Sequence, residues 1–173
     1  MKPHEKHRAL GLKEVGAAVV TVSTSRFEAK DSGKRFTDES GDVASNELAR
    51  AGISVSRREL VSDEASMIRD EVEKFLAGRE DVLIFVGGTG VSPRDVTVDT
   101  VHPYLEKEIQ GFGELMRSIS FRKVGTPAIL SRATAGVVKG KLIVCLPGSP
   151  DAARTGLRIF GKELPHILFV ARS

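Results

Sequence analysis

Short apolar segments alternate with longer amphipathic segments along most of the chain. The short segments are rich in β-branched residues and predict strands at 17–23, 53–61, 82–86, 127–131, 135–138 and 141–146. Apolar positions at helical spacing between them predict helices over about 38–52, 64–77, 95–105, 112–121 and 151–164. Residues 24–40 are polar and predict a long loop. This alternation favours βαβ units, hence an α/β fold whose parallel sheet is covered on both faces by helices.

The segment 82–95 carries the strongest local signal. Five apolar residues, Val82 to Val86, predict a strand buried on both faces, and glycines at 87, 88 and 90 follow at once. Thr89 and Ser92 add hydroxyl groups, Arg94 a cation and Asp95 a carboxylate. Open α/β sheets bind their ligands where strands end in this way. The pattern therefore favours a site for a phosphate-bearing ligand with a metal ion.

Other predicted strands end at the same edge of a parallel sheet. They bring four segments together there: 23–25, 62–63, 87–95 and 147–150. Helix-start amides bind anionic oxygens, and carboxylates such as Asp63 and Asp95 hold hard cations such as Mg²⁺. Simpler interpretations stay open at this point. The glycines could serve only a tight turn, the two aspartates could cap helices, and Ser149 could be a turn former.

Composition and charge exclude several classes of protein. A chain of 173 residues with 40% hydrophobic and 28% charged residues suits one ordinary domain, expected over 14–173 behind a flexible arm at 1–13. A net charge of +3 gives no argument for nucleic acid. No apolar run approaches the roughly 20 residues of a membrane helix, and no signal peptide is evident. With Cys145 as the single cysteine, a cytoplasmic protein is expected.

Three familiar motifs are absent. A phosphate-binding loop of the Gly-x-x-x-x-Gly-Lys-Ser/Thr type does not occur. The run from Gly88 begins like a dinucleotide fingerprint but has Pro93 where the third glycine belongs. Neither a cysteine pair nor a His-x₃-His spacing predicts zinc.

Three separate motifs resemble the MoaB/MogA family of molybdenum cofactor biosynthesis proteins. They are Gly87-Gly-Thr-Gly-Val-Ser-Pro-Arg-Asp-Val-Thr-Val-Asp99, Leu130-Ser-Arg132 with Ala135-Gly136, and Leu146-Pro-Gly-Ser-Pro150. The resemblance runs in register from about residue 17 to 164, nearly the whole chain. The Pro-Gly-Ser-Pro form and the N-terminal arm are more similar to the MoaB branch of the family than to MogA. One departure is that Ser23-Thr-Ser-Arg26 stands where Ser-Asp-Ser or Ser-Asp-Arg is commoner.

The resemblance implies a three-layer α/β/α sandwich with a mostly parallel sheet that binds molybdopterin. Family members assemble as trimers or as hexamers built from trimers. Active members use Mg-ATP to adenylylate the terminal phosphate of molybdopterin, release pyrophosphate, and pass the product to a cofactor-insertion partner. Neither nucleic acid nor a membrane is an expected partner.

Roles for individual residues follow from the resemblance by position. Asp63 and Asp95 are implied in catalysis and Mg²⁺ binding. The implied nucleotide-binding residues are Gly87, Gly88, Thr89, Gly90, Pro147, Gly148 and Ser149. The implied molybdopterin-binding residues are Ser23, Ser25, Ser131 and Arg132.

Two rival functions remain beside the adenylyltransferase. One is a non-catalytic molybdopterin-binding or assembly protein of the same fold, against which the presence of both Asp63 and Asp95 argues. The other is a nucleotide-cleaving enzyme related to competence-associated proteins, whose members usually carry further domains. The sequence decides neither between molybdenum and tungsten nor between trimer and hexamer.

Overall fold

The computed structural model describes residues 14–173, so the predicted arm at 1–13 lies outside the described residues. The strands are β1 (Gly16–Val22), β2 (Ser54–Val61), β3 (Val82–Val86), β4 (Lys107–Glu108), β5 (Thr134–Val138) and β6 (Lys141–Leu146). The α-helices are α2 (Thr24–Asp31), α3 (Glu39–Arg50), α4 (Ala65–Ala77), α5 (Thr97–Val101), α6 (Gln110–Val124), α7 (Pro150–Phe160) and α8 (Leu164–Arg172). Short 3₁₀ helices are η1 (His102–Tyr104), η2 (Thr126–Leu130) and η3 (Gly161–Glu163). No helix in 14–173 is long and apolar enough to cross a membrane.

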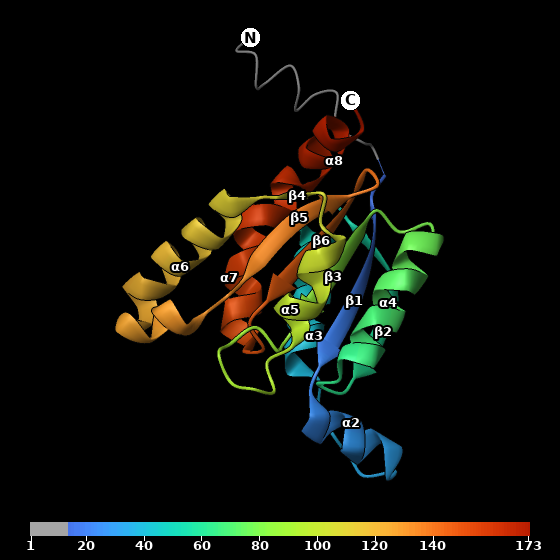
Figure 1. Ribbon diagram of the computed structural model, residues 1–173, viewed down its shortest axis with the longest axis vertical. Coiled ribbons are helices and arrows are strands. Elements are labelled where there is room, and N and C mark those ends of the chain that lie inside the picture. The colour runs from blue at the N-terminus through green and yellow to red at the C-terminus, as the bar shows by residue number, and fades with distance from the viewer. Residues whose placement is uncertain (1–13) are drawn as a thin grey trace.

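The six strands form one sheet in the order β2-β1-β3-β6-β5-β4 (Figure 1). Strands β2, β1, β3 and β6 are parallel, whereas β5 runs antiparallel to β6 and β4 antiparallel to β5. The central strands are buried almost throughout because helices cover both faces. The predicted α/β sandwich with a mostly parallel sheet is therefore confirmed.

Two apolar clusters define the layers. Leu48 of α3 and Leu157 of α7 pack on one face of the sheet, together with α6 and α8. Ile68 and Phe75 of α4 and Val101 of α5 pack on the other face. Alternate residues of β1 and β3 point into each cluster, as the period of a strand requires.

The structure corrects two of the predicted elements. Residues 24–31 form α2 instead of a loop, and residues 126–130 form η2 instead of a strand. α2 buries none of its residues, so no apolar period marked it as a helix. In 127–131 Pro127 stands at the start of a helical turn, where a missing amide costs nothing. The short edge strand β4 was not predicted.

Two helix boundaries also differ. The helix predicted over 151–164 ends at Phe160, and η3 and α8 follow it. The helix predicted over 95–105 is the shorter α5, followed by η1. Both changes fall near Gly161 and Pro103, residues that favour the end of a helix or a turn.

Candidate functional site

A cavity of about 540 Å³ opens at the carboxyl edge of the parallel strands. The loops that leave β1, β2, β3 and β6 all contribute to it, as expected for an open α/β sheet. We call it the carboxyl-edge cavity. Its lining residues are Val22, Ser23, Ser25, Arg26, Asp63, Gly87, Gly88, Thr89, Gly90, Asp95, Leu130, Ser131, Pro147 and Gly148.

The glycine turn after β3 needs its glycines for steric reasons. Gly87 and Gly88 have φ values of 118° and 65°, a region that favours residues without a side chain. A Cβ on Gly87 would collide with the carbonyl oxygen of Val22 in the neighbouring strand β1. Thr97 then holds the turn, with its hydroxyl donating to Gly87 O at 2.9 Å and its amide to Gly88 O at 3.1 Å. The turn is thus built for close backbone packing beside the cavity.

Asp63 follows β2 and reaches across to the start of α2. Its Oδ2 accepts hydrogen bonds from the Thr24 amide and the Thr24 hydroxyl, both at 2.8 Å. Ser23, the residue at the N-cap of α2, makes no side-chain cap bond of its own. Asp63 therefore caps α2 rather than α4, the helix that follows it in sequence. No hydrogen bond or ion pair within 14–173 engages its other oxygen, Oδ1.

Asp95 lies on the loop between β3 and α5. Its Oδ2 accepts from the Ser92 amide at 2.9 Å, and the same oxygen lies close to Gly90. The residue at the N-cap of α5 is Val96, so Asp95 does not cap that helix. Two carboxylates from different strand ends therefore line one cavity, each with one oxygen held by the protein.

Arg132 organises the loop that carries Asp95. Its guanidinium donates to Gly90 O at 2.7 Å, to Asp95 O at 2.8 Å and to both carboxylate oxygens of Asp99. Its backbone amide donates to Thr89 O. The hydrogen bonds between Arg132 and Asp99 lower the pKa of Asp99 and raise the pKa of Arg132. Arg132 does not line the carboxyl-edge cavity but a neighbouring cavity of about 460 Å³, which shares Ser131 with it.

Most of the predicted site residues meet at the carboxyl-edge cavity. Ser23, Ser25 and Ser131 lie in its wall. Pro147 and Gly148 line it too, whereas the Ser149 hydroxyl accepts from the Ala152 amide at 3.2 Å and caps α7. The turn-forming interpretation of Ser149 thus agrees with its geometry. Arg94, considered as a cation for the site, is exposed and not in the lining.

Arg26 is a site residue that the sequence did not single out. It lies in α2, lines the cavity and donates to the Ser40 hydroxyl at 3.1 Å. It is the only cation in the cavity lining among the described residues. Its side chain is 30% exposed and also lies 3.9 Å from Oδ1 of Asp38. Recognising α2 as a helix that begins at Thr24 would have placed Arg26 near Ser23.

The cavity suits a metal ion that arrives with a substrate. No group of three or more His, Cys, Asp or Glu side chains in 14–173 forms a closed metal site. Mg²⁺ commonly uses one or two carboxylates, with phosphate oxygens and water completing its shell. Asp63 and Asp95, each with one oxygen free of protein hydrogen bonds, fit that requirement.

The single thiol has no part in this chemistry. Cys145 lies in β6 within the apolar core, and burial raises its pKa to about 12. At neutral pH it is a thiol rather than a thiolate, and therefore a poor nucleophile.

The fold and the cavity define an open-sheet α/β protein with a ligand site at the carboxyl edge of its parallel strands. The profile of the family described as "Probable molybdopterin binding domain" matches residues 18–166. The chain belongs to this family.

Individual relatives support the same family assignment. A Methanocaldococcus jannaschii protein named "Probable molybdopterin adenylyltransferase" is 40% identical over 158 residues, which cover 91% of this chain and 94% of the relative. The Staphylococcus aureus (strain Mu50) "Molybdenum cofactor biosynthesis protein B" is 42% identical over 160 residues, covering 90% and 91%. The crystal structure of the tungsten cofactor synthesizing protein MoaB from Pyrococcus furiosus gives a TM-score of 0.83 at 32% identity, covering 94% and 99%. The resemblance to the MoaB/MogA family is thereby confirmed.

Proposed function

We propose that this chain is a molybdopterin adenylyltransferase. It transfers the adenylyl group of ATP to the terminal phosphate of molybdopterin and releases pyrophosphate. Family membership supports the substrate, and a relative with this name supports the reaction. The observation that carries the proposal is the meeting of Asp63 and Asp95 in one cavity beside the glycine turn of β3. A protein that only binds the pterin has no need of two carboxylates placed for a cation.

The reaction needs positioning more than proton transfer. The terminal phosphate of the pterin supplies the attacking oxygen, which forms a bond to the α-phosphorus of ATP as the bond to the β-phosphate oxygen breaks. No activated serine or cysteine is required. Arg26 lies where it can neutralise a phosphate, and the glycine turn lets the substrate approach the backbone.

Asp63 and Asp95 are the proposed ligands of Mg²⁺. The cation supplies charge neutralisation for the phosphate oxygens when it is bound. The Thr24 and Ser92 amides fix one oxygen of each carboxylate, so the free oxygens keep a constant position. Thr24 stands where an aspartate is commoner in the family, and here its hydroxyl orients Asp63.

Two substrates need two adjoining spaces. Ser131 lines both the carboxyl-edge cavity and the neighbouring cavity of about 460 Å³. Arg132 lines only the neighbouring cavity. We assign the nucleotide to the glycine turn and the Pro147-Gly148 segment. The pterin then lies toward Ser131 and Arg132, with Ser23 and Ser25 on the shared border.

Assembly into trimers or hexamers is part of the proposal. Large apolar side chains on α6 and η2 are exposed, which favours burial against a second copy. They are Leu115, Phe121, Val124, Ile129 and Leu130. Light scattering after size-exclusion chromatography measures the oligomeric state. A cofactor-insertion protein as the recipient of the product, and a cytoplasmic location, stay predictions.

The test is to mix purified protein with Mg-ATP and molybdopterin and to detect adenylylated pterin by mass spectrometry. Asp63→Asn and Asp95→Asn should each lower turnover about 100-fold or more while changing pterin binding far less. Asn at 63 keeps an acceptor for the Thr24 amide, so the start of α2 is preserved. Asp70→Asn, an exposed carboxylate on α4, is the matched control and should keep full activity.

Either of two results would contradict the proposal. Pterin binding without any product in the native chain would leave the non-catalytic binding protein. Product formation unaffected by EDTA, or by both Asn variants, would remove the carboxylates and the cation from the reaction.

A further inference from the structure

A further cavity lies between α3 and α7, near the C-terminal ends of both helices. Its volume is about 390 Å³, and none of its lining residues belongs to the carboxyl-edge cavity. We call it the α3–α7 cavity. Its lining residues are Glu47, Arg50, Ala51, Leu157, Arg158 and Lys162.

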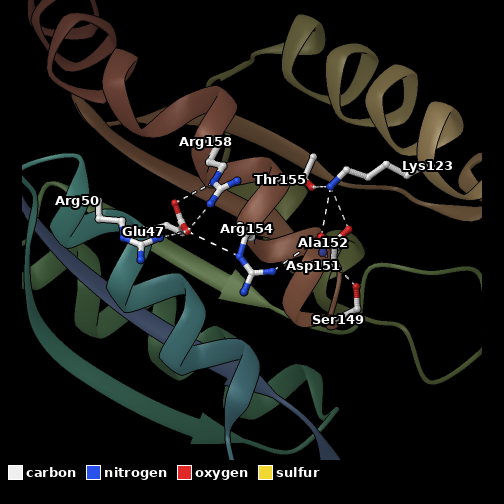
Figure 2. Close-up of polar contacts among 9 residues, drawn as sticks. All are labelled: Glu47, Arg50, Lys123, Ser149, Asp151, Ala152, Arg154, Thr155 and Arg158. Atoms are coloured by element: carbon white, nitrogen blue, oxygen red, sulfur yellow. Dashed lines mark hydrogen bonds and ion pairs between the residues drawn. The ribbon is translucent and has the colours of Figure 1, made fainter.

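A single carboxylate at this cavity is surrounded by guanidinium groups. The Glu47 side chain is only 7% exposed, and Arg50 and Arg158 donate to it at 2.8 Å and at 3.3–3.4 Å. Arg154 approaches the same carboxylate at 3.8 Å (Figure 2). One buried negative charge therefore fixes three arginines of two different helices in one place.

The positive charge at the cavity exceeds what Glu47 balances. Arg50 and Arg158 line the cavity with 68% and 61% of their side chains exposed. Each guanidinium has five N–H donors, and Glu47 uses only one of Arg50 and two of Arg158. Within 14–173 the ammonium group of Lys162 has no hydrogen-bond or ion-pair partner. Three cations against one anion leave the lining with a net charge of +2.

We propose that the α3–α7 cavity is a binding site for a phosphate or diphosphate group. Arginine presents paired donors that match phosphate oxygens, and Glu47 holds two of the arginines ready in position. Ala51 supplies apolar surface beside the cations, which suits the carbon skeleton of an organic phosphate. The cavity is of a size that admits such a ligand. This inference does not depend on the proposed adenylyl transfer.

The test follows backbone amide signals by NMR while inorganic pyrophosphate, inorganic phosphate or AMP is added. Amides of Ala51, Leu157 and Lys162 report the α3–α7 cavity, and those of Gly87 to Gly90 report the carboxyl-edge cavity separately. We expect saturable shifts at the first group with pyrophosphate. Larger shifts at Ala51 with AMP than with phosphate would identify an organic phosphate as the preferred source.

Variants locate the binding. Arg158→Gln/Lys162→Gln should weaken the saturable shifts at the α3–α7 cavity about tenfold or more, because it removes two charges that face the ligand. Arg79→Gln/Lys139→Gln removes the same charge from exposed positions elsewhere and should change the affinity less than about twofold. Linear, non-saturating shifts in the native chain would overturn the inference. So would equal weakening by both double variants, which would indicate a general charge effect.

Discussion

Helices α2 and α7 both begin where a central strand ends at the carboxyl-edge cavity, but the two are held in different ways. α7 is capped by its own Ser149 and buries Leu157 and Phe160 in the core beneath the sheet. α2 buries no residue and projects beyond the sheet, at the lower end of Figure 1. Its first amide donates to Asp63, a residue that follows another strand, β2. One wall of the cavity is therefore part of the core, and the other depends on a proposed metal ligand.

This difference shows how a site residue can serve two purposes at once. Asp63 offers one oxygen to the cavity and uses the other to position α2, which carries Arg26. Asp95, by contrast, does not cap the helix that follows it, α5. Replacing Asp63 by alanine would thus remove a proposed ligand and also the hydrogen bonds to the start of α2, whereas asparagine keeps an acceptor for the Thr24 amide.

The largest expected effect concerns the anchoring of α7. Leu157→Ala removes a side chain that is 2% exposed and should lower the free energy of unfolding by about 2–5 kcal/mol. Glu28→Ala, on the exposed surface of α2, should change it by less than about 0.5 kcal/mol. Urea denaturation measures both. Equal losses would mean that α2 contributes to the core as α7 does.

A smaller effect is expected where α2 meets Asp63. Thr24→Val keeps the shape of the side chain but removes the hydroxyl that donates to Asp63, at a cost of about 0.5–1.5 kcal/mol. Because α2 has no apolar anchor, we expect faster hydrogen exchange across residues 24–31 in this variant, measured by mass spectrometry. Ser149→Ala removes the cap of α7 and is the control, since buried side chains should keep α7 protected. Unchanged exchange in α2 would contradict the comparison.

The smallest effect concerns the ion pair between Arg132 and Asp99 of α5, beside the carboxyl-edge cavity. Hydrogen bonds from Arg132 hold the pKa of Asp99 below its usual range. A lowered folded-state pKa stabilises the protein above the unfolded-state pKa, and this contribution is lost as the pH falls through the folded value. Because the pair is exposed, we expect no more than about 0.5 kcal/mol from it. Carbon-detected NMR of the Asp99 carboxyl should show its pKa rising in Arg132→Gln, and an unchanged pKa would contradict the pairing.

The part of the cavity wall that belongs to the apolar core could be predicted from the sequence better than the part that long-range hydrogen bonds hold in place. The apolar run of β3 and the glycines after it placed the turn correctly, because a buried strand and its turn leave a strong local pattern. Asp63 and Asp95 were predicted to share an edge of the sheet, and the structure brings both to one cavity. Their roles as metal ligands stay predictions.

What the sequence did not predict depends on long-range hydrogen bonds. Helix α2 carries no apolar period, and the residue that caps it lies 39 positions away in Asp63. Arg132 was identified only through the family motif. Its bonds to Gly90 and Asp99 span 42 and 33 positions, so nothing in its own neighbourhood indicated them. Contacts of this kind become visible only once the sheet has set the loops side by side.

The order of the strands also bears on how the chain folds. β1 lies beside β3, and β3 beside β6, although Val20 pairs with Phe85 and Phe85 with Cys145, far along the sequence. Parallel pairings over such separations form slowly, since a long stretch of chain must be ordered before they are made. The Pro147-Gly148 wall follows β6, so a chain still emerging from the ribosome lacks it until all six strands have been made. The cavity is therefore complete only once residues 147–148 have been made, and shorter nascent chains lack this part of its wall.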